Sequence, residues 1–314
     1  MKIGIIGFGS IGGRHYQNLQ KFKKEIVVLT RRSDVDGVKC VSTWDDFKAQ
    51  GNYAAIFITN ETAKHLETIS KCLEMMPKAI FVEKPFTHNI NGLENLVKKI
   101  KQSGISVWVG YNFHFFEPLI RIKEIIKSGV LGKIFYMRVS VGQDLTEWRP
   151  RDYHLSYSSQ KEQGGGVMLD LVHDINYPAW LLDDKLKVEN CTIKRISDLD
   201  IEVEDWVESL FSTNSGVMIS VHQDYVRVPY NRSLEIAGSN GTLKWDTDSN
   251  RIYVLKKGGE IAIDEIIKFE RNDMYEKELN FFIDSMKKDV YFSNIDEAVY
   301  DVGLIEKLKK YAGK

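Results

Sequence analysis

Apolar and polar residues alternate along the first third of the chain in a way that predicts strands and helices in turn. Short apolar runs, each typical of a buried strand, occupy residues 2–6, 25–29, 53–58, 80–85 and 106–109. The amphipathic stretches between them predict helices over residues 13–23, 44–47, 63–73 and 90–101. Strands that alternate with helices indicate a parallel sheet with helices on both faces.

The pattern changes after Asn112. One amphipathic stretch predicts a helix over residues 119–128, and the alternating stretches that follow are typical of antiparallel strands with one wet face and one covered face. These strands are predicted at residues 134–141, 189–196, 204–212, 216–226, 232–237, 242–246 and 251–255, with helices at 275–287 and 295–310. We therefore expect an α/β domain over residues 1–118 and an α+β domain over 119–314, built on a largely antiparallel, open-faced sheet.

Composition and charge are those of an ordinary globular protein. The 314 residues include 43% hydrophobic and 28% charged side chains and have a net charge of −1, so nothing favours a nucleic-acid or membrane partner. No apolar run approaches the roughly 18 residues of a membrane span. The three cysteines, Cys40, Cys72 and Cys191, lack metal-ligand spacing, which favours free thiols in a reducing compartment. We expect a cytoplasmic protein.

A glycine-rich segment joins the first predicted strand to the first predicted helix. It reads Gly7-Phe8-Gly9-Ser10-Ile11-Gly12. In this spacing Gly7 permits a tight turn, Gly9 lets a pyrophosphate touch the backbone, and Gly12 allows close helix packing. The N–H groups at the start of the helix would face the phosphates. The segment predicts dinucleotide binding; the alternative is a purely structural glycine-rich turn.

The end of the second predicted strand bears on which dinucleotide is bound. NAD requires an acidic residue there for the ribose 2′-hydroxyl, but this chain has Thr30-Arg31-Arg32-Ser33. Guanidinium and hydroxyl groups suit a 2′-phosphate. We expect NADP, with NAD possible if both arginines are only solvated.

Polar residues follow several predicted strands at their carboxyl ends, where ligands bind in an open α/β sheet. They are Thr59, Asn60, Glu83, Lys84 and Asn112. Because proline cannot donate to a sheet ladder, Pro85 ends its strand and leaves Lys84 at the mouth of the expected cleft. The alternative is that Glu83 and Lys84 form a solvated pair at a surface turn.

Two segments of the second domain also carry candidate chemistry. Residues 142–153 form a polar-aromatic loop with Trp148, Arg149 and Tyr153, and loops of this length are usually functional or disordered. The glycines at 164–166 precede a predicted helix on which Asp170, His173 and Asp174 share one face. His173 is either a functional group or a histidine satisfied by Asp170. A metal half-site is disfavoured, because no third ligand cluster is evident.

Together these motifs resemble the glucose-fructose oxidoreductase, inositol dehydrogenase and rhizopine-catabolism (Gfo/Idh/MocA) family over essentially the whole chain. The segments that carry the resemblance are Gly7 to Gly12, Thr59-Asn60 with His65, Glu83-Lys84-Pro85, Gly110-Tyr111-Asn112, and Gly164-Gly165-Gly166 with Asp170 and His173. The resemblance implies a Rossmann domain and hydride transfer between NAD(P) and a sugar or polyol hydroxyl. It also implies Lys84 as the catalytic lysine, often with a cis bond to the proline, and Asp170 and His173 as its substrate-side partners.

The chain departs from the family pattern at one point. Members usually have three residues between the aspartate and the histidine, but only Leu171 and Val172 separate Asp170 from His173. Asp174 is therefore an alternative occupant of the histidine position. The short spacing, together with the 142–153 loop, is similar to members associated with amino-sugar and nonulosonic-acid pathways.

These observations predict an NAD(P)-dependent dehydrogenase or reductase for a nucleotide sugar or amino sugar. Oxidation of a secondary alcohol needs a base within hydrogen-bond reach of the hydroxyl, which is either Lys84 or His173. Trp148, Arg149, Tyr153 and Asp174 are the candidate substrate contacts. The alternative is an inactive dinucleotide or sugar sensor on the same fold. An exposed sheet face favours a homo-oligomer, either a dimer or a tetramer.

Overall fold

The computed structural model describes residues 1–32, 35, 37–148, 152–288 and 290–313. Its contacts divide the chain into two compact units, Met1–Tyr111 with Tyr275–Val302, and Asn112–Met274 with Gly303–Lys314. This grouping differs from the predicted division at residue 118, because the segment 275–302 packs with the first sheet although it follows the second in sequence.

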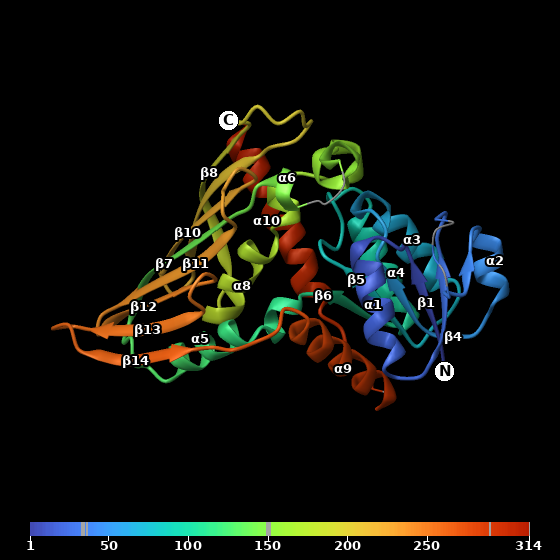
Figure 1. Ribbon diagram of the computed structural model, residues 1–314, viewed down its shortest axis with the longest axis horizontal. Helices are drawn as coiled ribbons and strands as arrows, with labels where there is room; N and C mark the ends of the chain where they lie inside the picture. Colours follow the sequence, from blue (N-terminus) through green and yellow to red (C-terminus); the bar gives the residue numbers. More distant parts are fainter. Residues whose placement is uncertain (33–34, 36, 149–151, 289, 314) are drawn as a thin grey trace. The chain divides into compact units, whose positions relative to one another are not determined.

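The first unit is built on a parallel sheet of six strands (Figure 1). The strands are β1 (Lys2–Ile6), β2 (Glu25–Leu29), β3 (Cys40–Val41), β4 (Tyr53–Ile58), β5 (Ala79–Glu83) and β6 (Ser106–Gly110). Their order is β3-β2-β1-β4-β5-β6, and every neighbouring pair is parallel. The order reverses between β1 and β4, and this switch point is where open α/β sheets bind ligands.

Helices cover both faces of this sheet, as the alternation predicted. They are α1 (Ser10–Gln20), α2 (Trp44–Ala49), the 3₁₀ turn η1 (Thr62–Lys64), α3 (His65–Leu73), α4 (Leu93–Ser103), α9 (Asp273–Lys287) and α10 (Ile295–Ala312). Successive strand residues face opposite cores, so that Ile56 packs with α2, α3, α4 and α10, whereas Phe57 packs with α1 and α9. The late segment therefore supplies part of both layers.

Residues just before α10 also protect the edge of the sheet. The side chain of Asn294 accepts from the Val109 backbone N–H at 2.7 Å and donates to the Val109 carbonyl at 2.9 Å. Ser293 donates to the Val107 carbonyl at 2.8 Å. These bonds satisfy backbone groups on β6 that an edge strand would otherwise present to another chain.

The second unit contains a sheet of eight strands. They are β7 (Ile134–Gly142), β8 (Leu186–Lys194), β9 (Trp206–Thr213), β10 (Met218–Asp224), β11 (Asn231–Gly238), β12 (Gly241–Asp246), β13 (Arg251–Lys256) and β14 (Ile261–Ile266). The order is β14-β13-β12-β11-β7-β10-β9-β8; β7 and β10 are parallel, and the other pairs are antiparallel. The predicted fold class is confirmed, and β14 is a strand that the sequence pattern did not predict.

Helices cover one face of this sheet, where α7 and α8 contact the central strands and α5 packs on α8 (Figure 1). The helical elements are η2 (Asn112–Phe115), α5 (Glu117–Lys127), α6 (Leu145–Trp148), η3 (Tyr153–Leu155), η4 (Tyr157–Ser159), η5 (Lys161–Gln163), α7 (Val167–Asp170) and α8 (His173–Leu182). β9 is buried at every second residue, and the residues between them, on its other face, are partly exposed. Among the described residues, no helix has the length and apolar character needed to cross a membrane.

Candidate active site

The glycine-rich segment forms a tight loop between β1 and α1. Gly7 has a φ of +95°, and a Cβ there would lie 2.6 Å from the backbone nitrogen of Asn60. A Cβ on Gly12 would clash with the carbonyl oxygen of Gly7 and lie 2.8 Å from Oγ1 of Thr59. A Cβ on Gly9, in contrast, would have no heavy atom within 4 Å. Gly7 and Gly12 therefore serve packing, whereas Gly9 leaves backbone exposed as a pyrophosphate requires.

Helix α1 begins earlier than predicted, at Ser10 rather than Gly13. The last three residues of the glycine motif, Ser10 to Gly12, thus form the first turn of the helix. Gly9 is the N-cap and supplies no side-chain hydrogen bond, so the first N–H groups of the helix have no side-chain cap. Such groups suit an anion, and the loop therefore fits the pyrophosphate of a dinucleotide.

Polar residues at the end of β4 and the start of α3 support this loop. Thr59 donates to the Gly7 carbonyl at 2.8 Å, and Asn60 Nδ2 donates to Thr68 at 2.9 Å. The imidazole of His65 lies 3.1 Å from the Asn60 carbonyl and 3.0 Å from that of Pro85. Burial lowers the pKa of His65, and a neutral imidazole carries one N–H, so it donates to one carbonyl at a time.

The residues predicted to select the cofactor lie beside the same loop. The guanidinium of Arg32 donates from Nη1 to the Phe8 carbonyl at 2.9 Å, and its backbone N–H donates to Oγ1 of Thr30 at 3.2 Å. Arg31 is exposed. Ser33 lies outside the described residues. Arg32 is thus held against the glycine loop.

Lys84 lies directly after β5, as predicted, and its bond to Pro85 is cis, as the resemblance implied. The preceding Glu83 is buried and faces α1, where its Oε1 lies 2.6 Å from Nε2 of His15. The imidazole of His15 packs edge-on against Phe81, with ring centroids 5.0 Å apart. Glu83 is therefore part of a buried network behind Lys84 and not a solvated surface residue.

The structure adds Glu278 of α9 to this network, a residue that the sequence reasoning missed. Glu278 accepts a hydrogen bond from the Trp108 indole at 3.0 Å and is almost completely buried. Burial, and secondarily the charge of Glu83, raises the pKa of Glu278 well above its ordinary value. The sequence did carry a signal for it. Glu278 lies four residues from both Met274 and Phe282, so it is an acidic residue on the apolar face of a predicted helix.

In the second unit, Asp170 is surrounded by hydroxyl groups. Its carboxylate accepts hydrogen bonds from Tyr157, from Ser158 at 2.6 Å and from Tyr225 at 3.0 Å. Asp170 is only 3% exposed. These contacts tie the turns before the glycine run to the end of β10, so that Asp170 organises the loop around it.

The prediction that one helix after the glycine run carries Asp170, His173 and Asp174 is wrong. Helix α7 ends at Asp170 because Leu171, with φ −101° and ψ +31°, leaves the helical region, and α8 begins at His173. Helical spacing therefore does not place Asp170, His173 and Asp174 on one face. The ring of His173 stacks on Phe113, with centroids 4.3 Å apart and an interplanar angle of 5°. Asp174 instead pairs with Arg232.

Two polar residues that follow β6 have distinct environments. Oδ1 of Asn112 is buried, and no residue in the described part of the chain gives it a hydrogen bond. Such an atom suits a donor from a ligand. His114 lies 2.9 Å from Oδ1 of Asn176, stacks on Trp180, and has its pKa lowered to about 4 by burial. His114 is therefore neutral at physiological pH.

The predicted substrate loop is only partly described. Trp148 ends α6 and packs edge-on against Tyr225, with ring centroids 6.1 Å apart, which links it to the Asp170 cluster. Tyr153 stacks on His154 and accepts a hydrogen bond from the Asp200 backbone at 3.3 Å. Arg149 lies outside the described residues.

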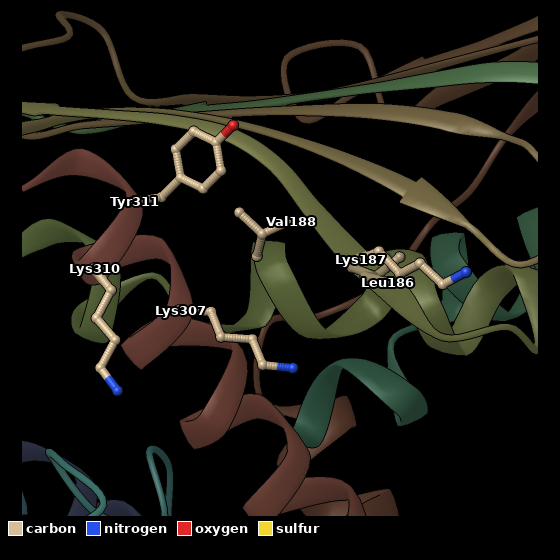
Figure 2. Close-up of a pocket in the computed structure, with 6 residues that line it drawn as sticks. All are labelled: Leu186, Lys187, Val188, Lys307, Lys310 and Tyr311. Carbon is tan, nitrogen blue, oxygen red and sulfur yellow. The ribbon is translucent and has the colours of Figure 1, made fainter. Parts of the chain in front are cut away.

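A surface hollow in the second unit lies between β8 and the end of α10. Figure 2 shows the residues that line it: Leu186, Lys187, Val188, Lys307, Lys310 and Tyr311. The three ammonium groups lie apart from one another in this view and do not converge on one point. Within the described ranges, no group of three or more His, Cys, Asp or Glu side chains is arranged to hold a metal ion.

Comparison with known proteins relates both units to one family. Residues 1–111 match the model of an oxidoreductase family with an NAD-binding Rossmann fold, and residues 119–244 match the model of the GFO/IDH/MocA C-terminal domain. The myo-inositol 2-dehydrogenase of Thermotoga maritima is 23% identical over 305 residues, covering 91% of this chain and 88% of that protein.

Solved structures share the fold of the entire chain. WlbA dehydrogenase from Bordetella pertussis, in complex with NADH and UDP-GlcNAcA, has a TM-score of 0.82 at 17% identity and covers all of this chain and 97% of its own. KijD10, a 3-ketoreductase from Actinomadura kijaniata solved as a point mutant with TDP-benzene and NADP, has a TM-score of 0.85 at 17% identity, with coverage of 99% and 97%. The predicted oxidoreductase is confirmed: the chain belongs to the Gfo/Idh/MocA family.

Proposed function

We propose that this protein is an NAD(P)-dependent dehydrogenase or reductase that acts on a secondary hydroxyl or keto group of a sugar, and specifically of a nucleotide sugar or amino sugar. The observation that carries the proposal is the open approach to Gly9 at the start of α1, on the same sheet edge as Lys84. Both groups lie at carboxyl ends of parallel strands in one sheet, where such sheets bind their ligands.

Hydride transfer to or from a sugar requires residues that bind the cofactor, transfer a proton and orient the substrate. A bound nicotinamide would supply or accept the hydride, and Asn112 and the glycine loop would hold the cofactor. The hydroxyl proton must leave or arrive in the same reaction, which requires a group within hydrogen-bond reach. We assign this transfer to Lys84 and the orientation of the substrate hydroxyl to His173. Asp170 supports the substrate loop through its three hydroxyl partners.

Substitution of Lys84 tests this assignment. Lys84→Met should lower turnover by about 10²–10⁴-fold, the usual range for losing a general acid–base group, while the dinucleotide dissociation constant changes little. Lys98→Met removes an exposed lysine of α4 and is the matched control; it should leave turnover and dinucleotide binding unchanged. If His173→Ala loses as much activity as Lys84→Met, the proton transfer belongs to His173. Near-normal turnover of Lys84→Met would show that Lys84 is structural.

The substrate class rests on the relatives and on the aromatic loop. One relative is named myo-inositol 2-dehydrogenase, and one fold neighbour was solved with UDP-GlcNAcA. We propose that Trp148, Arg149 and Tyr153 contact the sugar. A panel of polyols, free sugars and nucleotide sugars, assayed by the absorbance of the reduced cofactor, tests this. Tight cofactor binding without turnover of any compound would favour an inactive sensor.

We propose NADP as the preferred cofactor. Arg32 is held beside the glycine loop by the Phe8 carbonyl, and no acidic residue follows β2 directly. Fold neighbours were solved with NADH and with NADP, so the proposal rests on the arginines. Arg31→Ala and Arg32→Ala should each weaken NADPH binding by about 1.5–3 kcal/mol if they contact the phosphate, without changing NADH binding. Equal affinity of the unmodified protein for NADH and NADPH would refute the preference.

We also propose a cytoplasmic homo-oligomer, either a dimer or a tetramer. Cys40, Cys72 and Cys191 are free thiols, which suits a reducing compartment. The uncovered face of the second sheet is the expected interface. Light scattering would measure the mass, and Arg138→Glu on that face should shift it towards the monomer.

A further inference from the structure

A buried ion pair lies directly behind His173. Asp174, the next residue in α8, accepts from Nε of Arg232 at 2.8 Å through Oδ1 and from Nη2 at 3.0 Å through Oδ2. Asp174 is fully buried, and Arg232 of β11 is 8% exposed. Both carboxylate oxygens are thus used in a two-point bond, which fixes the relative position of helix and strand.

The same guanidinium also contacts Phe113, which in turn stacks on His173. Its central carbon lies 4.5 Å from the ring centroid of Phe113, the residue on which the imidazole of His173 stacks at 4.3 Å. Its Nη1 donates to the Tyr230 hydroxyl at 2.9 Å. Arg232 therefore supports His173 through the first turn of α8, by way of Asp174, and through the face of Phe113.

We propose that Arg232 is a positioning residue that fixes the imidazole of His173, and that Asp174 belongs to this support and not to the substrate site. The inference rests on the proposed function, in which His173 orients the substrate hydroxyl. A substrate group could reach Asp174 only by displacing a buried guanidinium, which would leave a charge unpaired. Asp174, at the alternative histidine position, is thus one partner of a buried salt bridge.

Two substitutions test the support from different sides. Phe113→Leu removes the stacked ring but keeps an apolar side chain. Arg232→Lys keeps the charge but loses the two-point geometry. Each should lower kcat by about tenfold to a hundredfold, the cost expected for misplacing a reacting group by roughly 1 Å, with little change in the dinucleotide dissociation constant. A third substitution, Arg121→Lys, is the matched control and should leave kcat unchanged, because Arg121 makes a similar two-point bond to Glu265 in the same unit.

A double-mutant cycle separates positioning from general damage. In a His173→Ala background, Phe113→Leu and Arg232→Lys should have no further effect on kcat, because the residue through which they act is gone. If either substitution lowers kcat by the same factor in both backgrounds, it acts elsewhere and the proposal is wrong. Unchanged kcat in both single variants, in a protein whose His173→Ala variant has lost activity, would also overturn it.

A spectroscopic measurement distinguishes this inference from the proposed function. The imidazole proton signals of His173, identified by their loss in His173→Ala, should be shifted upfield by the stacked ring and should move downfield in Phe113→Leu and, to a smaller extent, in Arg232→Lys. Full activity of His173→Ala would reject the catalytic part of the proposed function without affecting these shifts. Unchanged shifts in both variants would reject the support itself.

Discussion

His15 of α1 and Glu83 of β5 are joined by a contact of 2.6 Å between Nε2 and Oε1, although 68 positions separate them in the sequence. His15 follows the glycine loop by one helical turn, and Glu83 directly precedes Lys84. The contact therefore connects the helix that would face the pyrophosphate to the strand that carries the candidate catalytic lysine.

Loss of this contact should destabilise the first unit. His15→Leu leaves the buried carboxylate of Glu83 without the imidazole, and breaking a buried pair in this way costs about 3–5 kcal/mol. The free energy of unfolding in urea would measure the loss. Adding Glu83→Gln to His15→Leu should restore part of the stability, because an amide needs no ionic partner. A double variant less stable than His15→Leu would contradict this explanation.

Glu278 should make stability depend on pH. Its pKa is raised in the folded state above an ordinary value of 4.5, first by burial and then by Glu83. The stabilisation is therefore fully present below pH 4.5 and is lost progressively as pH rises through the folded-state pKa. Glu278→Gln keeps an acceptor for the Trp108 indole and cannot ionise, so its stability relative to the unmodified protein should increase with pH. If the difference in unfolding free energy between the two proteins is the same at all pH values, Glu278 is not protonated in the folded state.

Substitutions of two glycines in the loop should have opposite effects: one should weaken cofactor binding, and the other should destabilise the fold. Gly9→Ala adds a methyl group in open space at φ −79°, so stability should change by less than about 1 kcal/mol. Dinucleotide affinity should nevertheless fall by about tenfold or more, or 1.4 kcal/mol, because the methyl group occupies the approach of the pyrophosphate. Gly12→Ala should destabilise the fold by about 1–3 kcal/mol. Calorimetric titration and thermal unfolding would measure the two effects, and unaltered binding by Gly9→Ala would contradict the assignment.

His222 on the open sheet face provides a pH test in the second unit. Its Nδ1 lies 2.6 Å from Glu208 and its Nε2 lies 2.8 Å from Asp224, and these carboxylates, Asp224 first, raise its pKa to about 9. The resulting stabilisation should be complete below pH 6.5 and lost as pH rises through about 9. His222→Gln should therefore be less stable than the unmodified protein at neutral pH, and the difference should shrink in alkali. The imidazole titration by NMR would check the pKa; a midpoint near 6.5 would refute the double ion pair.

Local patterns were sufficient for the elements of the first unit. The predicted strands at 25–29 and 53–58 coincide with β2 and β4. They were predictable because a strand buried on both faces of a parallel sheet is a continuous apolar run. The glycine spacing, the strand ends and the lysine before Pro85 are likewise local signals, and with the resemblance they sufficed to predict the family and the class of reaction.

Elements without a local signal were missed. β14 is an edge strand with no buried residue, and its sequence, with three apolar residues followed by two acidic ones, does not alternate between apolar and polar positions. The break between α7 and α8 depends on the backbone of Leu171, which helical periodicity does not report.

The partners of the candidate site residues depended on the tertiary structure alone. The sequence identified His173 and Asp174 as candidates, but not that Arg232, 58 positions from Asp174, binds its carboxylate. Nor did it show that Tyr225, 55 positions away, donates to Asp170. Sheet register and helix packing bring such distant side chains together, and a residue pattern along the chain records which face a side chain occupies but not what lies opposite it.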